Sequence, residues 1–211
     1  MVTGATRVAI LAGLGVIGVV AALTYVRQNR GTGRMGGRIS RGKALWLGYA
    51  LSLWFVICPA LALDPQLPVP FRVVLGTFGV SMWARGLLEL YLLYVKHGWK
   101  SSYGVAHDAF CLAVILAQLV WLARQIVASL GTPLSGWALG LVGVVVISLL
   151  LEIGYARTFY RVVERRTTGK AGIWFASTDD PRFRSLVRVT AIANVPLYAF
   201  LLVFLIAVVG P

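Results

Sequence analysis

The sequence predicts an all-α, polytopic integral membrane protein, a single bundle of six transmembrane helices over residues 1–211. Of the 211 residues, 59% are hydrophobic and 13% are charged, and the mean hydropathy is +0.82, which is far too apolar for an average soluble domain. The apolar residues fall in runs of about 20, the length that crosses a bilayer as a helix. Lys and Arg lie mainly between these runs, as expected of loops that orient a membrane protein.

Helices are expected because backbone groups in hydrocarbon must form their hydrogen bonds within the protein. A β-barrel would instead show alternating segments of about ten residues, a pattern that this sequence lacks. The six expected spans cover residues 8–26, 44–63, 71–95, 107–127, 136–156 and 189–209.

The first span, 8–26, is preceded by one cation, Arg7, and followed by a strongly basic segment. A cleaved signal peptide would have the opposite charge bias, so we expect a retained helix that begins outside. GLGVIG lacks the strand context of a dinucleotide-binding fold, so we interpret Gly13, Gly18 and Ala22 as a helix-packing face.

The second span begins with Trp46 at its inner rim, and a proline-rich outer loop separates it from the third. The third span carries Arg85 and Glu89 four residues apart, which places both side chains on one helical face. The simplest interpretation is an ion pair that neutralises two charges in hydrocarbon.

The fourth span is expected to begin at His107 and Asp108, at the inner membrane rim. The fifth opens with Gly136-x-x-x-Gly140, a pattern typical of helix contacts, and carries Glu152 near its inner end.

The longest polar segment, 157–188, follows five spans and is therefore expected in the cytoplasm. Within it, Asp180 and Pro181 fit an N-cap and a first helical residue. The sixth span includes Asn194 and a kink-prone Pro196.

Charge distribution predicts the orientation. The three expected inner loops carry six, two and eight of the twenty Lys and Arg residues, which places both termini outside. The net charge of +13 thus reflects topology and contact with anionic lipid headgroups, and no nucleic-acid partner is expected. We expect a bacterial-type inner (plasma) membrane.

A comparison of two spans predicts a polar site. Leu87-Leu88-Glu89-Leu90 resembles Leu150-Leu151-Glu152-Ile153, and both carboxylates are expected about 8–10 Å beneath the cytoplasmic interface. The candidate pocket lies in the inner third of the bundle and comprises Arg85, Glu89, His107, Asp108, Glu152 and Asn194. The alternative is that these groups satisfy one another in structural pairs.

Cofactor and metal sites have little support in the sequence. His97 and His107 could in principle ligate one b-type haem, but both are expected at the interface rather than in the apolar interior. No metal site is expected, because Cys58 and Cys111 lie in different spans and no Cys/His metal spacing occurs.

Two classes of function fit these features, and a b-type haem protein with His97 and His107 as ligands is a third alternative. The first is a non-catalytic integral subunit or accessory protein of a larger membrane complex, in contact with lipids and with other subunits or copies of itself. The second is a small transporter, or a lipid- or quinone-handling enzyme, in which Glu89 or Glu152 accepts a proton. No catalytic residue can be assigned.

Overall fold

The computed structural model describes residues 3–30, 40–96, 98, 100–131, 133–162 and 181–209, and every regular element in these ranges is helical. The elements are α1 Gly4–Arg30, α2 Arg41–Ser52, the π-helical η1 Leu53–Ile57, α3 Cys58–Leu63, α4 Val69–Tyr94, α5 Ser101–Trp121, α6 Ala123–Ser129, α7 Pro133–Val162, α8 Pro181–Ala193 and α9 Val195–Val209. The predicted all-α class is confirmed.

Five described helical segments are long and apolar enough to cross a membrane. They cover Gly4–Arg27, Arg41–Leu63, Ser102–Trp121, Ser135–Thr158 and Val187–Phe204. Helix α4 is 26 residues long, but it carries charged residues and is not one of these five. The class of α-helical membrane protein is therefore supported, while a sixth span remains a prediction.

The second predicted span is one helical rod with a π-helical interruption. Pro59 lies at the start of α3 and has no backbone N–H, so it cannot donate the regular bond to the preceding turn. The N–H of Cys58 instead donates to the carbonyl of Leu53, five residues back. The local π-helical turn keeps α2 and α3 continuous.

The fourth predicted span differs from the observed helix at both ends. Helix α5 begins at Ser101, six residues before the predicted start, because residues 101–106, which include two serines and a glycine, are also helical. It ends at Trp121, after which the short α6 follows. His107 and Asp108 therefore lie inside the helix, and their predicted place at its first turn is wrong.

The last predicted span consists of two helices. Helix α8 begins at Pro181, as expected, whereas the proposed cap Asp180 lies outside the described residues. The helix is interrupted at Asn194, between α8 and α9. Pro196 lies in the first turn of α9, where its missing N–H costs no helical hydrogen bond. This break brings the Asn194 side chain against α2.

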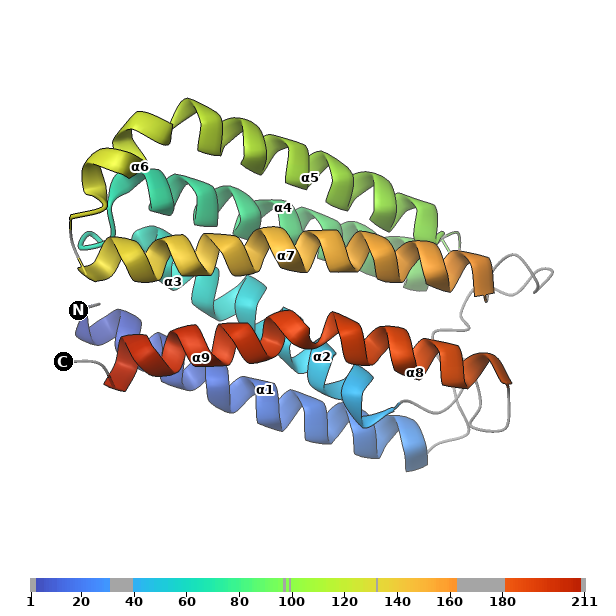
Figure 1. Ribbon diagram of the computed structural model, residues 1–211. Coiled ribbons are helices and arrows are strands. Elements are labelled where there is room, and N and C mark those ends of the chain that lie inside the picture. Colours follow the sequence, from blue (N-terminus) through green and yellow to red (C-terminus); the bar gives the residue numbers. More distant parts are fainter. Residues whose placement is uncertain are drawn as a thin grey trace.

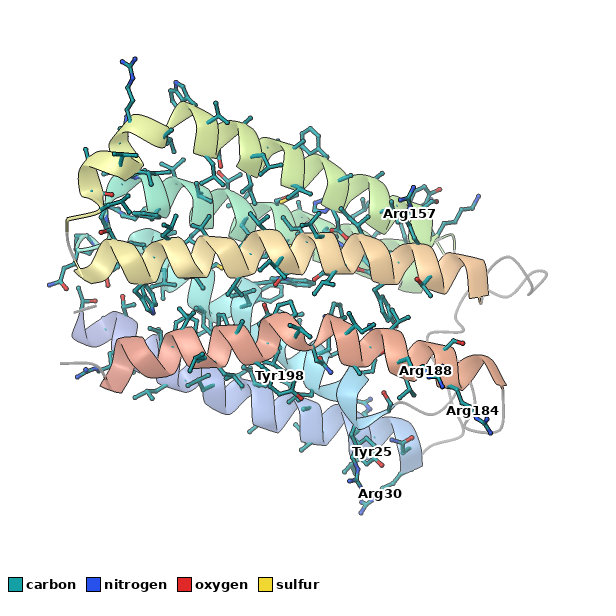
Figure 2. All side chains as sticks on the ribbon, in the orientation of Figure 1. Tyr25, Arg30, Arg157, Arg184, Arg188 and Tyr198 are labelled. Atoms are coloured by element: carbon teal, nitrogen blue, oxygen red, sulfur yellow. The ribbon has the colours of Figure 1, made fainter. Side chains whose placement is uncertain are left out.

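Helix α7 lies at the centre of the bundle and packs against α4, α5, α8 and α9. Helix α1 packs along α2, and α3 packs on α4. Figure 1 shows that α1 begins and α9 ends at the same end of the bundle. The side chains of Arg30, Arg157, Arg184 and Arg188 lie towards the opposite end (Figure 2).

Glycines determine how closely α1 approaches α2 and η1. A Cβ on Gly13 would lie 2.8 Å from side-chain atoms of Ser52 and Ile57, and a Cβ on Gly48 would overlap the Ile17 carbonyl oxygen. Gly13 thus belongs to a packing face as predicted. Gly18 and Ala22 are exposed, and a Cβ on Gly18 would meet nothing within 4 Å, so the part of the face that they were predicted to form makes no close contact within the chain.

A buried carboxylate joins the start of α1 to the loop after α3. Asp64 accepts hydrogen bonds from the backbone N–H and the hydroxyl of Thr3, both at 3.1 Å, and from the N–H of Gln66 at 2.9 Å. Burial opposes ionisation, but hydrogen bonds from Thr6, Gln66 and Thr3 outweigh it and hold the pKa of Asp64 below its usual value.

Candidate functional site

Arg85 is the centre of a buried charge cluster that also contains Glu89, His107, Asp108 and Glu152. Its Nη1 donates to Oδ1 of Asp108 and to Oε2 of Glu152, each at 2.6 Å. The distance from Nε to Glu89 Oε2 is 3.8 Å. The expected Arg85–Glu89 ion pair is present, but it is the longest of the three contacts and belongs to a larger cluster.

Three helices supply the cluster, which is why its members are far apart in sequence. Arg85 and Glu89 are on α4, His107 and Asp108 on α5, and Glu152 on α7. Asp108 is the most deeply buried member, with a side chain that is 0% exposed, while that of Arg85 is 12% exposed. Asp108 lies seven residues into α5, which corresponds to about 10 Å along the helix axis.

A glycine makes room for the guanidinium. Gly104 lies in the first turn of α5, and a Cβ there would be 3.2 Å from Nη2 of Arg85. The absence of a side chain at this position allows the start of α5 to lie directly against the Arg85 side chain.

His107 connects the cluster to the backbone of α4. Its Nε2 lies 3.0 Å from the carbonyl oxygen of Ser81 and 3.2 Å from the Ser81 hydroxyl oxygen. Nδ1 lies 3.4 Å from Oδ1 of Asp108. A neutral imidazole cannot donate from both nitrogens, whereas an imidazolium can donate to both oxygens. The geometry therefore accommodates an added proton.

The charges within the cluster do not cancel. One guanidinium faces three carboxylates, and the Lys43 ammonium on α2 interacts electrostatically with Glu89 and Glu152. With Lys43 included, full ionisation of the carboxylates leaves one negative charge unless a proton is bound. Oδ2 of Asp108 and Nε of Arg85 are also buried without a hydrogen-bond partner. Such atoms are costly in a low-dielectric interior.

Lys43 is the functional candidate that sequence reasoning missed, because it was counted among the loop cations. Ser40 caps α2 and accepts from the Lys43 N–H at 3.1 Å, so Lys43 belongs to the first helical turn. Its residue is 5% exposed, and its Nζ lies 3.8 Å from the Trp46 ring centroid and 4.1 Å from that of Tyr155. The signal in the sequence was Ser40 three residues before Lys43, a helix N-terminus.

Asn194 has a different set of contacts from the other predicted pocket residues. It is buried at the break between α8 and α9, where its Nδ2 donates to the Gly42 carbonyl at 3.1 Å. Its Oδ1 is buried without a hydrogen-bond partner. Five of the six predicted pocket residues are thus in one cluster, and Asn194 lies at the adjoining α2 junction. A functional role for any of them stays a prediction.

Of the residues considered for a cofactor or a metal, the structure describes His107, Cys58 and Cys111. His97 lies outside the described residues, so the predicted haem pair has only His107 within them. Cys58 and Cys111 are buried free thiols. Among the residues that the structure describes, no group of three His, Cys, Asp or Glu side chains is placed to hold a metal ion.

In comparisons with known proteins, no family model, no curated protein and no solved structure matches this chain.

Proposed function

We propose that this protein is a small proton-coupled membrane transporter in which the charge cluster takes up and releases a proton. The observation that supports the proposal is the gathering of three carboxylates from three helices around the single guanidinium of Arg85. Ionisable groups within a membrane-spanning bundle are costly and are typical of ion pathways and proton relays.

Arg85 has the role of tuning the carboxylates rather than holding an anionic ligand. Its Nη1 already donates to both Asp108 and Glu152, which occupies it with groups of the protein itself. His107, with a side chain that is 23% exposed, is the most accessible member of the cluster and lies next to Asp108. We therefore assign proton entry to His107 and proton storage to Asp108 and Glu152.

A charge-movement measurement tests the proposal. Proteoliposomes are adsorbed on a capacitive membrane, and the external solution is stepped from about pH 8 to about pH 6, a range in which histidine titrates. Proton entry into a site within the membrane displaces charge, so the wild type should give a transient current.

The variants E152Q and D108N should lose most of this current, whereas E164Q, which removes a carboxylate from the polar segment 157–188, should retain it. A wild-type response that is absent, or one that survives in the E152Q/D108N double variant, would contradict the proposal.

For the topology, we propose that α4 is the sixth span, because its 26 residues correspond to about 39 Å of helix. Both termini would lie outside, with the basic end of the bundle in the cytoplasm. The exposed Arg30, Arg184 and Arg188 would then contact anionic headgroups of a bacterial-type inner membrane. Labelling of single cysteines introduced at each end, from one side of sealed vesicles, tests this orientation.

A second candidate is an integral subunit of a larger membrane complex. It is favoured by the exposed stripe on α7, where a Cβ on Gly136 would meet nothing within 4 Å and one on Gly140 would meet only Val203 at 3.8 Å. Small residues that do not serve contacts within the chain are suited to a contact with another helix. Purification from the native membrane at native abundance should then yield a stoichiometric partner, and a chain that runs alone would contradict this candidate.

A further inference from the structure

The Lys43 ammonium lies between two aromatic rings in an arrangement suited to binding a cation. The rings of Trp46 on α2 and Tyr155 on α7 are nearly parallel, with centroids 6.2 Å apart and an interplanar angle of 22°. Nζ of Lys43 lies 3.8 Å from the first centroid and 4.1 Å from the second. We call the space between the rings of Trp46 and Tyr155 the aromatic slot.

Two independent features make the aromatic slot attractive to a positive charge. Aromatic faces carry negative potential and bind ammonium groups, with greater strength where water is excluded. Glu89 and Glu152 of the charge cluster also interact electrostatically with the group in the slot. The slot thus combines two ring faces with nearby carboxylates and is next to the proposed proton site.

The present occupant of the slot is a side chain from the first turn of α2. Lys43 lies three residues after the capping residue Ser40 and two residues after the exposed Arg41. Its ammonium is a point charge on a flexible four-carbon chain. Departure of this side chain would leave Trp46 on α2 and Tyr155 on α7 as the two walls of the slot.

We propose that the aromatic slot is a binding site for the primary ammonium group of a ligand, and that Lys43 fills it as an internal substitute when no ligand is bound. The ligand is either a soluble alkylamine or the ethanolamine headgroup of a phospholipid, which share this chemistry. This inference depends on the proposed transporter for its biological role. Exchange of one ammonium for another leaves the local charge unchanged.

The dimensions of the slot favour a primary ammonium over a bulkier cation. The Lys43 ammonium already lies within 4.1 Å of both ring centroids, and the rings are 6.2 Å apart. A trimethylammonium group carries three methyl groups in place of hydrogens, so it would require the rings to separate.

The test uses K43M, which keeps an unbranched side chain of similar length but removes the charge. The purified variant is heated in detergent with increasing n-butylammonium, the soluble equivalent of the lysine side chain, and with n-butanol as the neutral control. K43M should be stabilised by n-butylammonium at concentrations at least about tenfold lower than the wild type requires, because no tethered ammonium competes. n-Butanol should not reproduce the effect.

The double variant K43M/W46L removes one wall of the slot and should lose the n-butylammonium response. Equal responses of wild type and K43M, or a response that survives W46L, would overturn the inference. If K43M does not fold while K43R does, n-butylammonium present during extraction must restore folded K43M. Failure of that rescue would overturn the inference as well.

A lipid experiment distinguishes the two sources of the ammonium group. K43M in nanodiscs of phosphatidylethanolamine should no longer respond to soluble n-butylammonium if the headgroup fills the slot, whereas in phosphatidylcholine nanodiscs it should respond fully. An equal response in both lipids assigns the slot to soluble amines. Amine binding without the pH-step current would contradict the proposed transporter alone, and the current without amine binding would contradict the slot alone.

Discussion

Arg85 and Lys43 are two buried cations in one bundle, and they are stabilised in different ways. Arg85 donates at 2.6 Å to carboxylates from α5 and α7, whereas the Lys43 ammonium lies about 4 Å from two ring centroids. A planar guanidinium makes directional bonds to several carboxylates, while an ammonium is a compact charge that suits a ring face. Arg85 is therefore a fixed part of the fold, and Lys43 is a replaceable occupant of its site.

Removing each cation in turn should show how differently Arg85 and Lys43 are stabilised. R85M leaves Asp108 and Glu152 buried without their counter-charge, and we expect a loss of about 3–5 kcal/mol in the free energy of unfolding. K43M removes the two cation–π contacts and the electrostatic interaction with Glu89 and Glu152, and we expect a smaller loss of about 1–2 kcal/mol. Reversible unfolding in mixed micelles measures both. Equal losses would show that the two cations are held in the same way.

The stability lost on neutralising a carboxylate near Arg85 should be larger for the carboxylate that lies closer to the guanidinium. E152Q removes the charge from a 2.6 Å contact and should cost about 1.5–3 kcal/mol, whereas E89Q removes it from a 3.8 Å contact and should cost less. Unfolding of both variants at the same pH tests this order. A larger cost for E89Q would mean that the intrahelical pair dominates after all.

Asp64 is a buried charge outside the spans that accepts hydrogen bonds from Thr3 and Gln66, and it gives a pH-dependent test. Because its pKa is lower in the folded protein, it stabilises the fold above its unfolded value near 4 and loses this contribution as the pH falls through the folded value. D64N should cost about 1–2 kcal/mol at neutral pH. The difference from wild type should shrink in acid, and a difference that grows in acid would contradict this.

The tight contact between Arg85 and Gly104 predicts the smallest effect. G104A places a methyl group 3.2 Å from Nη2 of Arg85 and should cost about 1 kcal/mol. The matched control is G86A, beside Arg85 on α4, where a Cβ would meet nothing within 4 Å. Because alanine favours helices, G86A should be neutral or slightly stabilising. Thermal unfolding of the pair separates the contact from helix propensity.

Much of the fold could be predicted because its signals are local. Runs of apolar residues locate the helices, since each must satisfy its own backbone in hydrocarbon, and Pro181 marks the start of α8 correctly. The start of α5 was missed because residues 101–106 contain two serines and a glycine, which weaken the apolar signal, yet are helical. Helix ends are less well marked in a sequence than helix interiors.

The sequence by itself determined that charged side chains lie within the spans and that they need partners, because an isolated charge in hydrocarbon is too costly to retain. Only the tertiary structure decided the partners. It joined Arg85 to Asp108 and Glu152 rather than mainly to Glu89, placed Asn194 against Gly42, and closed Trp46 and Tyr155 around Lys43. Helical periodicity fixes which residues share a face, but the packing of α2, α4, α5 and α7 determines which faces meet.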